Sequence, residues 1–171
     1  MNGPGHPASE GRAPAILLVA AAVVLLALMP AWRWMARPLP PPEGYAISAE
    51  AFSAKVDAMT ARHATGEKTE DGGTVVRPPP GDVYLLASRW RFDPALELEV
   101  GRTYRLHVAT ADVTHGFNFP LGGADFLLVP GHAYVVTLTP AHPGDFAMQC
   151  SEYCGQSHSR MKSQVRIVPS R

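Results

Sequence analysis

A short segment near the C-terminus, residues 150–161 with the sequence CSEYCGQSHSRM, gathers side chains that bind metals. It holds both cysteines of the chain, together with one histidine and one methionine. Thiolate, imidazole and thioether ligands select copper, zinc or iron rather than calcium or magnesium. A second imidazole lies upstream in the segment 112–117 (DVTHGF). The candidate donors of a soft-metal site are therefore Cys150, Cys154, His158, Met161 and His115.

The presence of a second cysteine helps to distinguish between several kinds of metal site and a disulfide. One Cys with two His and a Met would suit a single blue-copper ion. Two copper ions that share both thiolates would account for the extra Cys. Two Cys and two His would also complete a zinc site, and a Cys pair outside the cytoplasm is usually a disulfide. We favour copper because zinc leaves Met161 without a role, and because a pair that only forms a disulfide needs neither His115 nor His158.

The pattern Cys-x3-Cys-x3-His-x2-Met with a His upstream resembles the CuA domain of cytochrome c oxidase subunit II. The similar region runs from about residue 82 to 168, and it includes the turns at 130–131 (PG) and 143–146 (PGDF) and the stretch 152–155 (EYCG). The resemblance implies a dinuclear CuA centre of two copper ions. Its implied ligands are Cys150 and Cys154 as bridges, His115 and His158 with one copper each, and Met161 and the backbone carbonyl of Glu152 as weak axial ligands.

Three further residues are candidates for supporting roles. Metal-bound imidazoles are usually oriented by hydrogen bonds to neighbouring groups, and Asp112 and Tyr153 lie close in sequence to the predicted ligands. Trp90 lies in the segment 89–94 (RWRFDP), where the resembling family often carries a run of aromatic residues. We expect Trp90 to contact the electron donor. His107 is predicted to face outward from its strand and receives no role.

The elements that must position these residues are predicted to be β-strands. From residue 82 onward, apolar side chains recur with a period of two, and Gly and Pro punctuate them about every ten residues. This pattern is typical of a β-sandwich or barrel. The resemblance implies a Greek-key β-barrel of the cupredoxin type, mainly β. The metal-binding segment would then be a loop between strands 145–149 and 162–168, with His115 at another strand end.

The N-terminal half is predicted to contain an anchor and linkers. Residues 1–12 are polar and predicted to be disordered. Residues 13–32 carry no formal charge, and this stretch is long enough to form a bilayer-spanning helix. We assign 13–36 to a retained anchor rather than a cleaved signal peptide, because the stretch is long for the latter. Residues 37–81 are predicted to be proline-rich linkers around a short amphipathic helix at 48–63, which lies on the membrane, on a partner or free in solvent. The domain 82–171 follows.

The composition excludes one class of function and the resemblance implies another. The 15 basic and 15 acidic residues give zero net charge without a long basic run, so we expect no nucleic-acid partner. The resemblance implies an electron-transfer subunit of a heme-copper oxidase, with no bond-making chemistry of its own. It would accept electrons from cytochrome c or a cupredoxin and pass them to heme in catalytic subunit I. The domain would lie on the periplasmic side of a bacterial membrane.

Two alternatives stay open at the level of sequence. The same domain could serve a heme-copper nitric oxide reductase, since the difference lies in the partner subunit. A Sco-like copper chaperone or thiol-disulfide protein also has a membrane anchor and Cys-x3-Cys. That family needs alternating helices and strands and a histidine far downstream of the cysteines. The upstream position of His115 and the period-two pattern both disfavour it.

Overall fold

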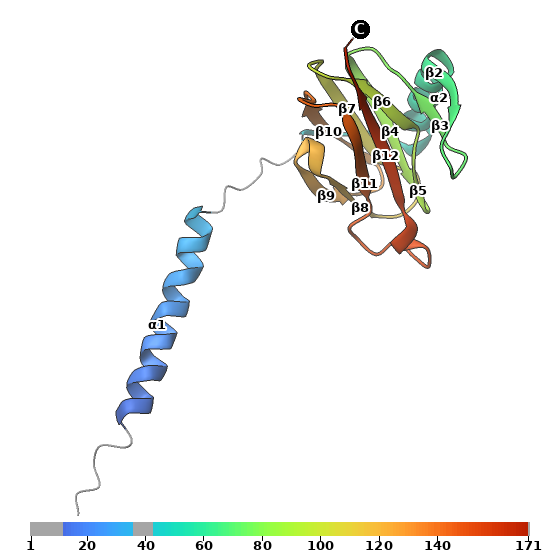
Figure 1. Cartoon of the computed structure of the whole chain (residues 1–171). Helices are drawn as coiled ribbons and strands as arrows, with labels where there is room; N and C mark the ends of the chain where they lie inside the picture. Colours follow the sequence, from blue (N-terminus) through green and yellow to red (C-terminus); the bar gives the residue numbers. More distant parts are fainter. Residues whose placement is uncertain (1–11, 36–42, 171) are drawn as a thin grey trace, which may run out of the picture. The chain divides into compact units, whose positions relative to one another are not determined.

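The computed structural model describes residues 12–35 and 43–170 as two separate compact units, a helix and a β-sandwich (Figure 1). The predicted disordered tail, apart from Arg12, and the polyproline spacer before residue 43 lie outside the described residues. Each unit is considered by itself below.

The first unit is a single apolar helix, α1 (Arg12–Met35). Its segment Ala13–Met35 has a mean hydropathy of 2.6 in its most apolar window, so it is long and apolar enough to cross a membrane. Pro30 lies inside the helix near its C-terminal end. In a membrane, a helical proline is tolerated because neighbouring groups can satisfy the carbonyl that it leaves unpaired. The segment predicted to be an anchor therefore forms one continuous helix over the described residues, which could span a membrane.

The second unit consists of two β-sheets that pack face to face (Figure 1). The first has the strand order β1-β10-β7-β4-β5, formed by Glu43–Ala46, His132–Leu138, Tyr104–Thr110, Gly81–Ser88 and Arg91–Asp93. The second has the order β2-β3-β6-β12-β11-β8-β9, formed by Ala64–Lys68, Thr74–Val76, Ala95–Glu99, Lys162–Val168, Gly144–Gln149, His115–Phe119 and Ala124–Leu128. Short 3-10 turns, η1 (Pro120–Gly122) and η2 (His158–Arg160), complete it. The mainly β fold class predicted from sequence is confirmed.

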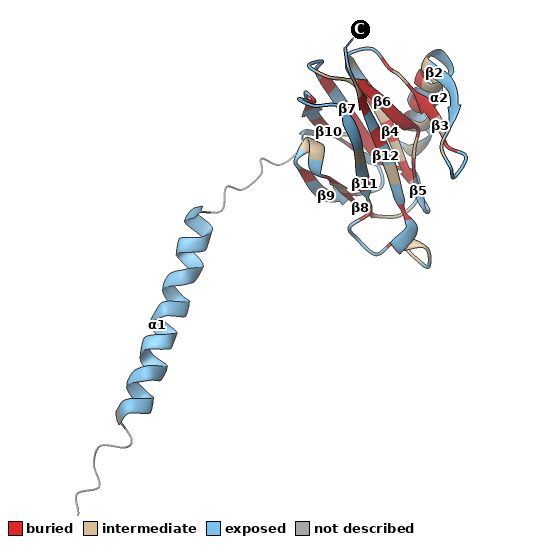
Figure 2. Cartoon of the chain, in the orientation of Figure 1, coloured by how far each residue is buried: buried red, intermediate tan, exposed pale blue. Residues whose placement is uncertain are grey.

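The core lies between the two sheets and follows the predicted alternation (Figure 2). On β4 the side chains of Val83, Leu85 and Ala87 are fully buried, as the period of two requires. β4 pairs with β7 in parallel, with Leu85 opposite Val108, so the inward faces of the two strands coincide. Apolar burial of this extent is the main source of stability for a sandwich of this size.

A short helix covers the outer face of the first sheet, and a short strand extends the edge of that sheet. Helix α2 (Ala49–His63) is capped by Ser48, whose hydroxyl accepts a hydrogen bond from the Ala51 backbone N–H. Its buried side chains, Phe52, Val56 and Met59, pack on the sandwich rather than on a membrane or a partner. Strand β1 pairs with β10 beside it. The helix therefore belongs to the same compact unit as the strands.

Residues 64–81, expected to form a loop and a rigid spacer, contain two more strands. β2 and β3 form an antiparallel pair, and β3 continues in parallel along β6, with Val76 opposite Leu96. Glu97 on β6 is buried, and Arg77 forms an ion pair with its carboxylate. The hairpin thus extends the second sheet by two strands and buries a charge in a paired state.

His107 also differs from its prediction, because other parts of the chain cover the face on which it lies. The sequence placed it on the outer face of β7, and that face is covered by α2 and by the Tyr45 side chain of β1. His107 is buried, with its Nδ1 3.0 Å from the Tyr45 hydroxyl and its Nε2 3.1 Å from an Asp82 carboxylate oxygen. Both ring nitrogens are thereby satisfied, so the residue fastens β1 to the sheet.

We predict that Phe52→Ala lowers the free energy of unfolding by about 3–5 kcal/mol, because it empties a fully buried site between α2 and the sheet. Urea unfolding of the purified chain measures the loss. Asp57→Ala on the exposed face of α2 is the control and should change stability by less than about 0.5 kcal/mol. Equal effects from the two variants would contradict the packing of α2 on the sandwich.

Candidate metal centre

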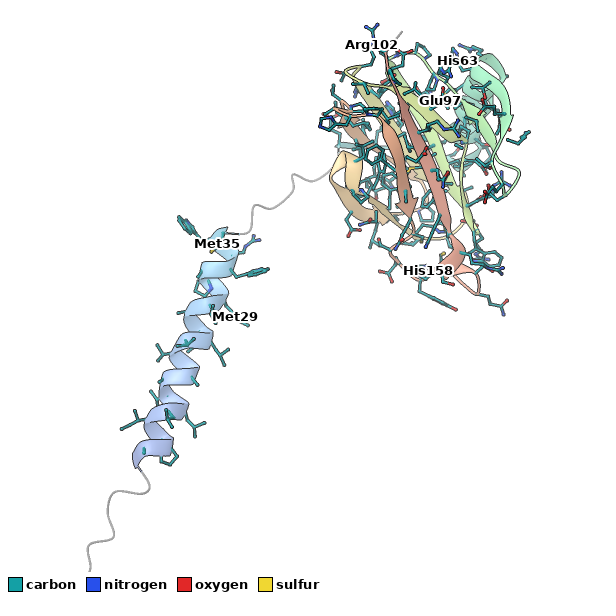
Figure 3. All side chains as sticks on the ribbon, in the orientation of Figure 1. Met29, Met35, His63, Glu97, Arg102 and His158 are labelled. Atoms are coloured by element: carbon teal, nitrogen blue, oxygen red, sulfur yellow. The ribbon has the colours of Figure 1, made fainter. Side chains whose placement is uncertain are left out.

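The predicted donors converge at one end of the sandwich, on the loop that joins β11 to β12. Figure 3 places His158 at this end and Arg102 at the opposite end. The loop is closed at its base by a hydrogen bond from the Cys150 N–H to the Met161 carbonyl, at 3.1 Å. Within it, the His158 N–H donates to the Gly155 carbonyl, at 3.0 Å. The loop is therefore an ordered turn structure whose two ends are fixed by neighbouring strands.

The two sulfur atoms lie side by side without bonding to each other. Cys150 Sγ and Cys154 Sγ are 3.7 Å apart, whereas a disulfide requires about 2.05 Å. Both cysteines are free and buried. His115 Nδ1 joins them in a cluster whose three ligand atoms all lie within 4.8 Å of one another. The structure thus brings together residues from two distant parts of the sequence.

The remaining predicted donors lie around this pair. Cys150 Sγ is 3.8 Å from His115 Nδ1 and 3.1 Å from the Glu152 carbonyl oxygen. Cys154 Sγ is 3.7 Å from His158 Nδ1 and 3.6 Å from the Met161 sulfur. Each sulfur therefore has one imidazole and one weaker donor within 4 Å. All six groups predicted from the sequence are adjacent.

Asp112 holds the imidazole of His115 in this orientation. An Asp112 carboxylate oxygen lies 2.9 Å from His115 Nε2, which leaves Nδ1 directed at Cys150. Burial would raise the pKa of Asp112, but hydrogen bonds from His115 and from the N–H groups of Arg89 and Val113 lower it below its usual value. The carboxylate is thus charged near neutral pH and selects the tautomer with hydrogen on Nε2.

The interior of the site is dry. His115 and Phe117, on the inward face of β8, are completely buried, and Met161 is 1% exposed. Burial raises the pKa of the Cys154 thiol to about 11, and the adjacent Cys150 acts in the same direction. Both thiols must lose a proton before they can bind a metal, so metal binding at neutral pH is coupled to proton release.

Comparison with known proteins identifies the family. Residues 82–168, half of the chain, match the family described as cytochrome c oxidase subunit II, periplasmic domain. The chain belongs to this family. It is therefore a subunit II-type protein of copper-related electron transfer, within an oxidoreductase complex.

Solved structures agree with the fold. A chain in a cryo-EM structure of a heme-copper terminal oxidase dimer aligns with a TM-score of 0.51 at 19% identity, over 91% of this chain and 99% of that one. A variant of the copper protein rusticyanin aligns with a TM-score of 0.50 at 16% identity, over 75% of this chain and all of that one. The periplasmic domain of oxidase subunit II from Bradyrhizobium japonicum aligns with a TM-score of 0.48 at 23% identity, over 52% and 83% of the two chains.

The cupredoxin-type fold predicted from sequence is thereby confirmed. It also weighs against a Sco-like chaperone, because the compact unit of residues 43–170 is a β-sandwich with one helix rather than an alternation of helices and strands. The chemistry of the donors fits the copper that subunit II relatives imply. Two thiolates, two imidazoles and a thioether are soft ligands suited to copper.

Sequence reasoning did not single out Gly116, which the structure places against the predicted metal-binding loop. A Cβ atom at this position would lie 2.5 Å from the Glu152 nitrogen and 2.7 Å from the Ser151 nitrogen. The loop of residues 150–161, the ligand loop, therefore lies directly on the β8 backbone. Only a glycine at position 116 permits this close approach. A glycine inside a strand is itself a signal of such close contact.

Tyr153 and Trp90 lie on the surface above the centre. Tyr153 is 73% exposed, and its ring lies 5.9 Å from the ring of His158, centroid to centroid. Trp90, in the turn between β4 and β5, is 37% exposed and packs against Gly155. The two side chains, together with Cys154, help to line a shallow surface hollow. Tyr153 thus contacts an imidazole by its ring, and Trp90 reaches the ligand loop by packing.

We predict that Gly116→Ala displaces the loop of residues 150–154, because a Cβ would meet the Ser151 hydroxyl and the backbone nitrogens of Ser151 and Glu152, and the two backbone atoms cannot move aside by side-chain rotation. The amide resonances of Ser151 and Glu152 should shift in the metal-free chain, with a loss of about 1–3 kcal/mol in unfolding free energy. Gly44→Ala on β1 is the matched control, because its nearest contact would be an ordinary 3.4 Å to the Ala133 carbonyl. Unchanged resonances would refute the close approach.

Proposed function

We propose that this chain is the electron-accepting subunit of a terminal heme-copper oxidase. It would hold a dinuclear CuA centre on the periplasmic side of a bacterial membrane, anchored by α1. Electrons from cytochrome c or a cupredoxin donor would pass through this centre to heme in the catalytic subunit, where dioxygen is reduced. The observation that carries the proposal is the pair of free, adjacent sulfurs with an imidazole and a weak donor beside each.

The residues that would hold the two coppers are those the geometry brings together. Cys150 and Cys154 would bridge, His115 and His158 would each add one imidazole, and Met161 and the Glu152 carbonyl would be weak ligands. Bound copper would supply a one-electron couple shared between two metals. Zinc requires only four ligands, so it would leave the thioether and the carbonyl, both within 4 Å of a sulfur, without a role.

The protein's own contribution is to keep these donors fixed and dry. Asp112 fixes the His115 ring by a hydrogen bond, and the Cys150–Met161 backbone bond closes the loop. Phe117, on the same face of β8 as His115, is completely buried. A site held by its scaffold changes little in geometry when an electron arrives, so the energy of reorganisation is small. Rigid supporting groups of this kind are the usual way in which a protein tunes a bound metal.

The surface above the loop is our proposed contact for the electron donor. Trp90 packs on Gly155, the residue that follows Cys154, so its exposed indole lies one residue from a proposed bridging ligand. Tyr153 presents an exposed ring beside His158. Aromatic residues are enriched where protein surfaces associate. A donor that docks on these two rings would approach the centre without crossing the sandwich.

We predict two copper ions per chain, measured by metal analysis of the purified protein. Cys150→Ser should abolish the dinuclear electron paramagnetic resonance spectrum, because only one bridging sulfur is left. Met161→Leu should shift the midpoint potential and retain two coppers, since it removes only a weak ligand. A single copper per wild-type chain would refute the dinuclear centre.

The matched control for Met161→Leu is Met148→Leu. Met148 is equally buried, but it lies within β11 rather than in the loop of residues 150–161, and it is not one of the proposed ligands. An exchange of Met for Leu conserves volume and usually costs less than about 1.5 kcal/mol in a core. The control should leave both the potential and the copper content unchanged. Equal shifts in the two variants would remove Met161 from the ligand set.

We further predict that Asp112→Ala weakens copper binding by about 10- to 100-fold, because the His115 imidazole loses the group that orients it. Asp112→Asn keeps an oxygen that accepts the same hydrogen bond, and it should recover most of the affinity. Competition with a copper chelator measures both. Equal affinities for the wild type and Asp112→Ala would contradict the orienting role.

A further inference from the structure

The β8–β9 ribbon has two faces with different roles. Its inward face carries His115 and Phe117, which are buried against the sulfurs and the core. Its outward face carries Gly116 and Asp125, because side chains alternate along each strand. The antiparallel register sets Gly116 opposite Leu127 and Asn118 opposite Asp125. The outward face therefore offers a flat position at Gly116, with an exposed carboxylate nearby on the neighbouring strand.

The ligand loop lies on this outward face. β11 pairs with β8 through Gln149 and Asn118, and two residues further the same register brings Ser151 opposite Gly116. The atoms nearest to a Cβ at Gly116 would be the Ser151 hydroxyl and the backbone nitrogens of Ser151 and Glu152. The chain thus passes from Cys150 to Glu152 in direct contact with the ribbon. This contact restricts movement of the loop only toward the ribbon.

A hydrogen bond from the same face of the ribbon also holds the loop. The Ser151 hydroxyl donates to an Asp125 carboxylate oxygen at 3.0 Å, and Asp125 lies on β9, outside the metal-binding segment. Hydrogen bonds to a charged acceptor are shorter and stronger than those between neutral groups. The next residue, Glu152, presents the carbonyl oxygen that lies 3.1 Å from Cys150 Sγ. Ser151 therefore connects the ribbon to the carbonyl.

We propose that Asp125 is a positioning residue for the metal centre, which acts through Ser151 to fix the distance between the Glu152 carbonyl and the Cys150 sulfur. Gly116 supplies the surface on which the loop lies, and Asp125 keeps it there. The metal-related part of this inference rests on the proposed function. A change of either partner in the hydrogen bond would free the Glu152 peptide to rotate while leaving the cysteines, the histidines and the core in place.

The first arm of the test uses the full-length, metal-free, reduced chain. Asp125→Ala and Ser151→Ala should each speed amide hydrogen exchange at residues 151–153 and shift the carbonyl carbon resonance of Glu152. Asp125→Asn, which keeps an acceptor oxygen, should behave like the wild type. The double variant should add nothing to the single ones, since both remove the same bond. Asp57→Ala removes an exposed acid on α2 and should change nothing.

The second arm uses the copper-loaded chain. Asp125→Ala and Ser151→Ala should retain two coppers but lose them to a chelator about 10-fold faster. Their electron paramagnetic hyperfine pattern and midpoint potential should shift together, and Asp125→Asn should restore both. A general loss of stability would not produce this paired shift, and the melting temperature of the metal-free variants monitors such a loss.

The two arms separate failure of this inference from failure of the proposed function. If Asp125→Ala leaves hydrogen exchange and the Glu152 carbonyl resonance unchanged, the positioning role is overturned whatever the metal content. If the metal-free effects are present but the wild type binds no copper, the loop contact is supported and the copper centre is refuted. If the wild type binds two coppers and the variants match its spectrum and potential, Asp125 does not act on the centre.

Discussion

The arrangement of this domain depends on one constraint: two cysteine sulfurs must lie next to each other, buried and unbonded. At 3.7 Å they are too far apart for a disulfide and close enough to share metal ions. Two thiols on a free loop would readily oxidise to a disulfide outside the cytoplasm. Their separation has to be maintained by the surrounding structure, and the loop is accordingly held at its base, along its length and through its ligands.

The β-sandwich supplies these restraints from several directions. β11 and β12 fix the two ends of the loop through their pairing, and the Cys150–Met161 backbone bond closes it. β8 brings His115 from below and lies against Ser151 and Glu152 through Gly116. The β4–β5 turn places Trp90 on Gly155 from above. Since these strands share one core, the position of each donor is coupled to the stability of the whole sandwich.

Two carboxylates of the sandwich, Asp112 and Glu97, have hydrogen-bonding or charged partners. Asp112 accepts hydrogen bonds from His115 and from the backbone N–H of Arg89, so it joins a ligand to the turn that carries Trp90. At the other end of the sandwich, Arg77 neutralises the buried Glu97. Isolated charges in a dry interior are costly unless paired. The pairing lets the protein bury His115 beside the sulfurs and Glu97 on β6.

Local pattern was sufficient to predict the strands of the core and the membrane-compatible helix, and to single out the side chains that the structure gathers around the two sulfurs. Residue type shows which side chains can bind a metal, and the spacing of apolar residues along the chain indicates strands and helices. The same information could not reveal that residues 43–81 pack on the sandwich, because that depends on which surface they meet. The apolar outward side chains of β4, Tyr84 and Leu86, were the available sign that this face is covered.

The sequence by itself determined which atoms could bind a metal and the order in which strands and loop occur. Only the tertiary structure decided that His107 is buried, that Gly116 must lack a side chain, and that Asp125 reaches Ser151. The physical reason is that these features arise from contacts between segments distant in sequence. Residue type and spacing along the chain determine which groups a segment contains. The packing of the sheets determines which other groups they contact.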